Sequence, residues 1–364
     1  MIRHANELLA RLRAIHASIR DRVVASCEEQ AIEQLSAIVA EQAGDTIFAL
    51  DRVSEEALIE EFTALGHERS FVLIAEGLGE DGLRVFPEGT APDAAELCII
   101  IDPIDGTRGI VYQKRPAWIL TGVAPNRGAQ TSLADIELAV QTEIPLLKQH
   151  LSDSFWAISG QGAGGERLNR LTGTREPLSP RPSRAQTIAY GFGNIARFVP
   201  GGRAEMAAID DAVVERLLGP VQPGQAQCFE DQYICTGGQL AELLTGHDRW
   251  IADLRALADE RARKDGHALG LNCHPYDLCT ELIAREAGLP ITDAAGARLA
   301  APLDVDTGIS WLGCANEHIY AQVAPVLRDV LRQHGLLDAS NGAPDQQEPV
   351  EVFNSHQKRV QTGE

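Results

Sequence analysis

Hydrophobic residues recur at two spacings in the first hundred residues, and each spacing predicts a different kind of element. Over residues 5–42 they recur every three or four positions, which predicts one or two long helices that end near Gly44. Shorter apolar runs at residues 46–50, 71–75 and 97–101 predict strands, of which the last is buried on both faces. The first part of the chain therefore combines long helices with a buried sheet.

An acid stands at the end of each of these three runs, namely Asp51, Glu76 and Asp102. One acid at a strand end is ordinary, but three that are separated by helices and turns indicate a common acidic pocket. Such a pocket agrees with the rule that ligands of open α/β sheets lie just beyond the carboxyl ends of the strands. A helix is expected soon after the first acid, with Ser54 as its cap.

The remainder of the chain alternates in the same way. Strands are expected at residues 118–123, 136–141, 155–158, 187–190, 250–252, 290–293 and 309–315. Helices are expected at residues 145–150, 204–218, 238–244, 253–264, 276–287 and 317–335. No clear helix follows the glycine cluster at residues 159–165, so we interpret this cluster as a β-turn and not as a dinucleotide loop.

A proline-containing stretch at residues 173–186 separates two halves, each of ordinary domain size. We expect an N-terminal α+β subdomain over residues 1–182 and a C-terminal α/β subdomain over residues 183–337. Residues 338–364 are polar, contain proline and lack periodicity, so they are expected to form a disordered tail. The fold class that follows from this alternation is α/β.

Composition narrows the classes of function. The chain has 364 residues and is 44% hydrophobic and 23% charged, which is typical of a globular protein. Its 52 acidic and 32 basic residues give a net charge of −20, which argues against binding to nucleic acid or to an anionic membrane. A small phosphorylated metabolite stays compatible with this charge, because bound cations can reverse the local sign of a site.

Several features favour a cytoplasmic location. Seven scattered cysteines without a CxxC pair are typical of reduced, buried thiols, and not of disulfides or a zinc site. The N-terminus does not read as a signal peptide, and no apolar run has the length of a membrane span. The first helix is expected to cover the core, and it can contribute to the interface of a homodimer.

The stretch richest in chemistry is residues 102–107, which read Asp-Pro-Ile-Asp-Gly-Thr after a buried strand. Pro103 favours an extended Asp102 and restricts its own φ, so the two carboxylates are expected in a stiff corner. Gly106 permits a tight turn or the close approach of a ligand, and Thr107 can cap a helix. Two carboxylates beside backbone N–H groups suit a divalent cation with a phosphate ester.

With this hexapeptide in place, the chain resembles the inositol monophosphatase family. The family belongs to a superfamily of Mg²⁺-dependent, lithium-sensitive phosphatases that also contains fructose-1,6-bisphosphatases and bisphosphate nucleotidases. Glu76 upstream, and Tyr276-Asp277 with a helix that ends before Gly288 downstream, follow the family's order. The resemblance covers about residues 5–330 and is weakest between about 165 and 270.

The resemblance implies a fold, an activity and a metal. The implied fold is the layered sandwich of the inositol monophosphatase/fructose-1,6-bisphosphatase type, in which α and β layers alternate. The implied activity is hydrolysis of a small phosphate monoester, on a sugar, a polyol such as inositol, or a nucleotide. Two or three Mg²⁺ ions would assist an in-line attack by an activated water, because paired cations stabilise both the attacking and the leaving oxygen.

The resemblance also implies which residues hold the metal. Glu76, Asp102 and the backbone carbonyl of Ile104 would hold the first Mg²⁺. Asp102, Asp105 and Asp277 would hold the second, so that Asp102 bridges the two ions. All of these ligands offer hard oxygen atoms, which Mg²⁺ requires.

Further roles follow for the phosphate and for the attacking water. Asp105, Gly106 and Thr107 would bind the phosphate, the last two with backbone N–H groups at a helix start. Asp51 and the Thr107 hydroxyl would orient the attacking water and help to deprotonate it.

Three positions depart from the pattern of the family. Gly77 follows Glu76 where the family usually has a second glutamate, which puts a third metal ion in doubt. Tyr276 stands in place of the usual tryptophan and is an acceptable aromatic. Gly270 occupies the position of a glutamate that contacts substrate hydroxyls in inositol monophosphatases, which counts against myo-inositol phosphate as the natural substrate.

Two other classes of protein stay open at this point. A non-catalytic metal-binding or regulatory relative is favoured by the glycine after Glu76 and opposed by the otherwise complete set of acids. A Rossmann oxidoreductase is a distant third. Arg108 and Lys114 are secondary candidates for substrate contact, whereas His247 and His274 are interpreted as structural, because a metal pair needs no imidazole base.

Overall fold

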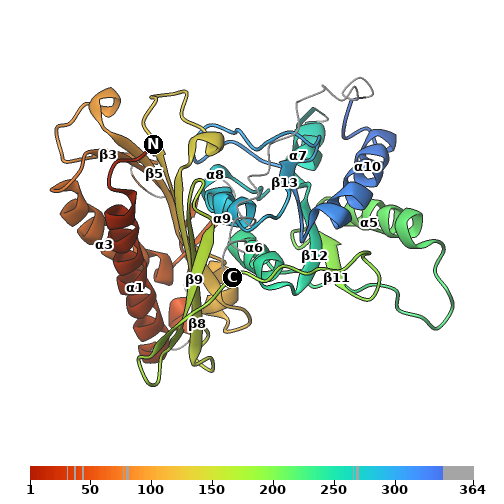
Figure 1. Cartoon of the computed structure of the whole chain (residues 1–364), viewed down its shortest axis with the longest axis horizontal. Coiled ribbons are helices and arrows are strands. Elements are labelled where there is room, and N and C mark those ends of the chain that lie inside the picture. The colour runs from red at the N-terminus through yellow and green to blue at the C-terminus, as the bar shows by residue number, and fades with distance from the viewer. Residues whose placement is uncertain are drawn as a thin grey trace, which may run out of the picture.

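The computed structural model describes residues 1–30, 32–36, 38–42, 45–76, 78, 82–264, 266–267 and 270–338. The predicted tail lies outside the described residues from residue 339 onward. Within the described part, no helix combines the length and the apolar character that crossing a membrane requires. Helices and sheets alternate in layers across the molecule (Figure 1).

The larger sheet has eight strands. They are β3 (Phe71–Ile74), β4 (Leu83–Phe86), β5 (Leu97–Asp105), β6 (Ala117–Pro125), β7 (Leu138–Ile144), β8 (Leu151–Ile158), β9 (Ala163–Asn169) and β10 (Arg175–Pro177). Their order is β10-β9-β8-β7-β6-β5-β3-β4. β3 and β5 run parallel, and the other neighbouring strands run antiparallel. β5 to β7 are buried on both faces almost throughout, which explains why they read as nearly continuous apolar runs.

One face of this sheet is covered by α1 (Ala5–Glu29) and α3 (Ala49–Gly66) (Figure 1). The short helix α2 (Ile32–Leu35) and the antiparallel hairpin of β1 (Ile38–Gln42) and β2 (Asp45–Phe48) connect these two helices. Apolar side chains of α1, including Leu12 and Ile19, are fully buried against the sheet. The hydrophobic residues that recur every three or four positions along α1 therefore form the side of the helix that faces the core.

The other face of the sheet is covered by α6 (Thr236–Thr245), α8 (Pro275–Leu278) and α9 (Glu281–Glu286) (Figure 1). These helices lie between the larger sheet and a four-stranded one. The strands of the smaller sheet are β11 (Phe192–Ile195), β12 (Asp248–Asp253), β13 (Ile291–Asp293) and β14 (Trp311–Cys314), in the order β11-β12-β14-β13. The outer face of the smaller sheet is covered by α5 (Arg203–Leu218), α7 (Arg255–Lys264) and α10 (Glu317–Gln333).

The layers confirm the predicted α/β class and the alternation of α and β layers. Three apolar cores separate the layers: one under α1 and α3, one between the two sheets, and one under α5 and α10. The division into subdomains at residue 182 stays a prediction. The middle core matters most for function, because it joins the larger sheet to the short helices that carry residues from the second half of the chain.

The prediction of one or two long helices over residues 5–42 is confirmed for α1, which ends at Glu29, and is wrong for the residues that form β1. Gln30 takes an extended backbone conformation, and α2 and β1 follow. The run that includes Ile38 and Val39 is β-branched, and such side chains are better accommodated in a strand than in a helix. Spacing alone did not separate these two states over so short a segment.

The strand predicted at residues 46–50 corresponds to β2 and ends two residues earlier than predicted. β2 ends at Phe48 and α3 begins at Ala49, so Asp51 lies in the first turn of a helix and not at the end of a strand. Acids are favoured in this first turn by the helix dipole. Ser54 is not a cap, because it lies inside α3 and its hydroxyl donates to the carbonyl of Asp51 at 2.7 Å.

Three further elements differ from expectation. Residues 145–150 form a turn and not a helix, and the strand expected at residues 187–190 is found five residues later as β11. The helix expected over 276–287 is divided into α8 and α9. Residues 159–162 of the glycine cluster form the turn between β8 and β9, as predicted, whereas residues 163–165 belong to β9.

Candidate metal centre

A bulge in β5 brings two carboxylates to the same face of the larger sheet. Asp102 pairs with Leu120 of β6, and Asp105 pairs with Trp118, so three steps on β5 match two steps on β6. In a regular strand, residues three apart point to opposite faces, and one extra residue corrects this. Pro103 lies in the bulge, where the lack of a backbone N–H does no harm.

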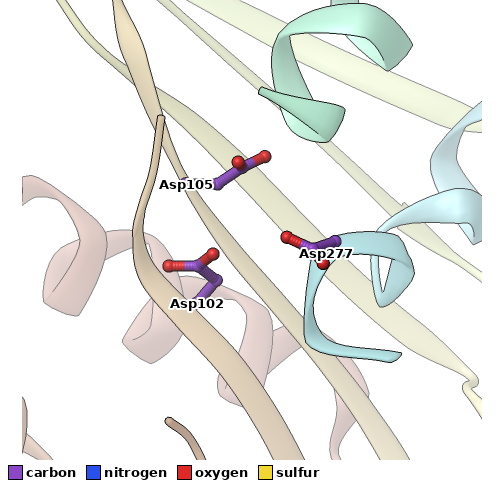
Figure 2. Close-up of side chains that lie close together, drawn as sticks. All are labelled: Asp102, Asp105 and Asp277. Atoms are coloured by element: carbon purple, nitrogen blue, oxygen red, sulfur yellow. The ribbon is translucent and has the colours of Figure 1, made fainter. Parts of the chain in front are cut away.

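Asp277 reaches the same place from the second half of the chain. It lies in the first turn of α8, and its carboxylate accepts a hydrogen bond from the backbone N–H of His274 at 2.6 Å. Figure 2 shows that Asp102 and Asp105 project from one strand toward Asp277 on the facing short helix. One carboxylate oxygen from each of the three lies within 4.8 Å of the other two. Three hard oxygen donors at this spacing fit a divalent cation.

The electrostatics of this cluster favour a bound cation. Burial, followed by repulsion from Asp105, Asp277 and Glu76, raises the pKa of Asp102 well above its usual range. Burial and the charge of Asp105 do the same to the pKa of Asp277. Burial raises the pKa of Asp105 to about 6, although the N–H of Gly237 acts in the opposite direction. A divalent cation would remove the repulsion that raises these pKa values.

The first turn of α6 holds the carboxylate of Asp105. The N–H of Gly237 donates to Asp105 Oδ2 at 2.5 Å, and the thiol of Cys235 donates to the backbone carbonyl of Asp105 at 3.2 Å. A Cβ atom at Gly237 would stand 2.5 Å from Leu120 Cδ2. Glycine therefore favours this close approach of α6 to the strand that bears the acids, because an added Cβ atom would require the buried Leu120 side chain to shift.

Thr107 and Asp51 form a hydrogen-bonded pair beside the acids. The Thr107 hydroxyl lies 2.9 Å from Asp51 Oδ1 and 2.9 Å from the carbonyl of Ile104, and its single hydrogen can be donated to either. Thr107 is the first residue of α4 (Thr107–Val111). Gly106 precedes it with φ of 95°, in the left-handed region that glycine adopts without strain.

Glu76 lies on the exposed side of the same site, two residues after the end of β3. Its charge raises the pKa of Asp102 and of Asp277, so it is close to both carboxylates. The following residue, Gly77, lies outside the described residues. The prediction that Gly77 affects a third metal ion is therefore untested.

The four acids of this site and the Thr107–Asp51 pair line one cavity of about 160 Å³. The residues that sequence analysis assigned to the site and that line the cavity are Asp51, Glu76, Asp102, Ile104, Asp105, Gly106, Thr107 and Asp277. The structure therefore brings the whole assigned set together. Which of them bind metal and which take part in chemistry stays a prediction.

Comparison with known proteins identifies the fold. No family model matches the chain, and no curated protein matches it by sequence. The holo form of fructose-1,6-bisphosphatase from Leishmania major is similar in structure, with a TM-score of 0.64 and 15% identity over 88% of this chain and 93% of that one. The extragenic suppressor protein SuhB from Bartonella henselae has a TM-score of 0.60 and 15% identity, over 88% and 98% of the two chains.

A third solved structure agrees with these two. The inositol monophosphatase of Thermotoga maritima has a TM-score of 0.57 and 17% identity, over 89% of this chain and 99% of that one. The chain has the inositol monophosphatase/fructose-1,6-bisphosphatase fold. The likeness extends over nearly the full length of each neighbour, so both halves of the present chain take part in this fold.

Within this fold, the site contains residues that sequence analysis missed. Arg255 lines the cavity, where its guanidinium makes a bidentate pair with the fully buried Asp253 and donates to the carbonyl of Leu271 at 3.0 Å. The guanidinium carbon lies 4.5 Å from the centre of the Phe198 ring. An acid and a base two residues apart after a short apolar run were the available signal for this pair.

The secondary candidates from sequence separate into two groups. Arg108 lines the cavity, whereas Lys114, His247 and His274 are absent from its lining. The ring of His274 packs against Tyr276 at 5.4 Å, and its Nδ1 lies 3.2 Å from the carbonyl of Thr307. This structural position agrees with the role that the sequence predicted for His274.

Proposed function

We propose that this protein is a Mg²⁺-dependent phosphatase that hydrolyses a small phosphate monoester of a sugar, a polyol or a nucleotide. One observation carries the proposal: the carboxylates of Asp102, Asp105 and Asp277 converge within 4.8 Å in a cavity that also contains the Thr107–Asp51 pair. The fold agrees with this proposal, since two of the similar structures bear the names of phosphatases.

The donors in the cavity fit Mg²⁺. Asp102, Asp105, Asp277, Glu76 and the carbonyl of Ile104 would hold it, and all five offer oxygen atoms. Bound Mg²⁺ would neutralise phosphate charge and make a bound water more acidic. Cysteines are also near, but the thiol of Cys235 is occupied by hydrogen bonds with the backbone of Asp105 and Gly238.

The Thr107–Asp51 pair supplies the groups for proton transfer. When the Thr107 hydroxyl donates to Asp51, its oxygen is left with lone pairs that can accept a hydrogen from the attacking water. Asp51 then holds the Thr107 hydroxyl in this orientation and can accept the proton. The opening N–H groups of α4 have no carbonyl partner within that helix, and we expect the N–H groups of Gly106 and Thr107 to bind the phosphate.

Further residues of the cavity lining would contact the leaving group. Phe198, Ile234 and Leu271 present apolar surface there, and Arg255 presents N–H donors that are anchored from behind by Asp253. This combination of apolar surface with a few fixed donors is typical of small-molecule sites. We expect the choice among substrates to depend on these residues, because the acids would hold the metal and act on the phosphate that all candidate substrates share.

A phosphate-release screen tests the function. Purified protein with Mg²⁺ would be offered sugar phosphates, inositol phosphates, histidinol phosphate and adenosine bisphosphates. We expect release from at least one, and a loss of about 10²–10³-fold in kcat in Asp102→Asn, because a weakened metal ligand stabilises the charge of the transition state less well. Asp329→Asn removes an exposed acid from α10 and serves as the matched control with unchanged activity.

Calorimetric titration with Mg²⁺ beside the screen separates the alternatives. Binding of Mg²⁺ without release from any ester would support the non-catalytic relative and would contradict the phosphatase. Release that persists in the presence of a chelator would contradict the metal requirement. Activity in wild type that is lost in Asp102→Asn and kept in Asp329→Asn would support the proposal.

A further inference from the structure

Gln141 is a buried polar residue in the middle of an apolar layer. It lies at the centre of β7 and is 0% exposed. In the register of the sheet it follows Asp102 and Leu120 in one row across the strands, and Phe155 comes next. Residues in such a row share a face, so Gln141 points into the same layer as Asp102, between the larger sheet and α6, α8 and α9.

Both ends of the Gln141 carboxamide have partners. Its Nε2 donates to the carbonyl of Gly237 at 2.7 Å, and its Oε1 accepts from the hydroxyl of Thr280 at 3.0 Å. Because a backbone carbonyl can only accept, this partner determines which end of the carboxamide is the nitrogen. Thr280 is 1% exposed, so these bonds lie in an environment without competing water.

Each partner belongs to a segment that carries one acid of the cluster. Gly237 donates its own N–H to Asp105 Oδ2 at 2.5 Å. Thr280 is the residue before α9 and follows Asp277 by three positions. The carboxamide therefore connects the start of α6, which holds Asp105, with the junction of α8 and α9, which presents Asp277.

We propose that Gln141 is a positioning residue for the metal centre, which holds the segments of Asp105 and Asp277 at the spacing that a divalent cation needs. The inference rests on the proposed function, because it assumes that the acids bind the Mg²⁺ of that function. The three carboxylates repel one another, so a fixed connection behind them is required to keep them converged without a cation. An apolar side chain would fill the same space in this core but could make neither bond.

The test compares Mg²⁺ affinity with stability in the full-length protein. Gln141→Met removes both hydrogen bonds and keeps most of the side-chain volume. Groups that orient metal ligands from behind contribute about 10–100-fold to metal affinity, so we expect the Kd for Mg²⁺, measured by calorimetry, to rise by at least tenfold. At saturating Mg²⁺, kcat should stay within about threefold of wild type, because no group that touches substrate has changed.

Two further variants make the readout specific. Thr280→Val breaks one of the two bonds and should also weaken Mg²⁺ binding, whereas Thr280→Ser keeps the hydroxyl and should restore it. Thr142→Val is the matched control, because Thr142 follows Gln141 in β7, points to the other face and also loses buried hydrogen bonds. It should lower the melting temperature without changing the Kd for Mg²⁺.

The outcomes are distinct. Equal Mg²⁺ affinities in wild type, Gln141→Met and Thr142→Val would reduce Gln141 to a structural residue and overturn the inference. Wild type that binds Mg²⁺ but releases no phosphate would contradict the proposed function alone, and the affinities would still decide the role of Gln141. Wild type that binds no Mg²⁺ would overturn both.

Discussion

Asp102 and Asp105 lie three positions apart in a strand, a spacing that normally sends two side chains to opposite faces. The bulge in β5 removes this difference and leaves both carboxylates on the face toward α8. The proline between them was the available sign of a bulge, because proline within a sheet is confined to edges and irregular places. At the residue scale, the one extra residue of this bulge brings the two carboxylates close enough to bind the same cation.

Thr107 provides a prediction about the proposed role of the Thr107–Asp51 pair in proton transfer. Thr107→Val removes the hydroxyl that lies 2.9 Å from Asp51 and keeps the shape of the side chain. We expect kcat for phosphate release to fall by about 10²–10⁴-fold, the usual contribution of a positioned acid or base. Thr107→Ser keeps the hydroxyl and should retain kcat within about tenfold. Wild-type kcat in Thr107→Val would show that this hydroxyl takes no part.

His16 provides a prediction about pH. It lies on α1, fully buried, with its ring nitrogens 2.8 Å from Thr121 Oγ1 and 3.1 Å from Thr142 Oγ1. Burial, and then the charge of Arg20, lowers the pKa of His16 to about 3. The unfolded chain therefore binds one more proton than the folded protein between about pH 3 and 6.5, and stability falls as pH falls through this window.

His16→Gln tests this sign. Equilibrium unfolding of wild type and variant between pH 4 and 7 should give two curves that converge toward low pH, because the variant has no imidazole to protonate. The difference in slope should approach about 1.4 kcal/mol per pH unit, the value for one proton. Parallel curves would show that His16 is not held neutral in the folded protein.

At the scale of elements, the short helices α8 and α9 depend on close contact with the larger sheet. A Cβ atom at Gly122 of β6 would stand 2.6 Å from the carbonyl oxygen of Cys279, which lies between the two helices. Glycine at this position lets the junction approach the strand. The α8–α9 segment reads as one amphipathic helix in the sequence, and this contact belongs to the tertiary structure that divides it.

Gly122→Ala follows as a prediction at this scale. The added methyl group would displace Cys279 and, with it, the turn that presents Asp277. We expect a loss of roughly 1–3 kcal/mol in the free energy of unfolding, which is typical of overpacking, together with weaker Mg²⁺ binding. Denaturant unfolding and calorimetry measure the two effects. Lower stability with unchanged Mg²⁺ affinity would mean that the displacement does not reach Asp277.

At the scale of the whole molecule, the cluster of acids joins sequence-distant parts of the chain. Asp102 and Asp105 come from the eight-stranded sheet, and Asp277 comes from a helix in the layer between the sheets. A cation at this place would bind the folded protein and not the unfolded chain, in which these residues are far apart. Mass action then predicts that Mg²⁺ stabilises the fold.

A thermal denaturation series tests this linkage. Mg²⁺ should raise the melting temperature of wild type, and the added free energy of unfolding should be about 2.7 kcal/mol at a hundred times the Kd. NaCl at matched ionic strength controls for screening of the net charge. Asp102→Asn should lose the response, while Asp329→Asn should keep it. The same shift in Asp102→Asn as in wild type would contradict a site at this cluster.

The sequence by itself determined the layered class, the central strands and the list of acids. Strands buried on both faces have to be continuous apolar runs, and Asp-Pro-Ile-Asp-Gly-Thr is specific enough to carry a resemblance. The sequence wrongly predicted that Asp51 lies at the end of a strand, and it did not predict the division of the helix over residues 276–287. A local pattern does not contain the tertiary contacts that decide such boundaries.

Only the tertiary structure decided which residues support the acids. Gly237 and Gln141 lie in different elements from Asp105 and Asp277. Their hydrogen bonds depend on how the layers pack against one another, and the sequence does not show which layers are neighbours. The same holds for Arg255, which faces the cavity because Asp253 and Leu271 hold it there. Local chemistry can be read along a chain, but the convergence of distant side chains depends on long-range packing.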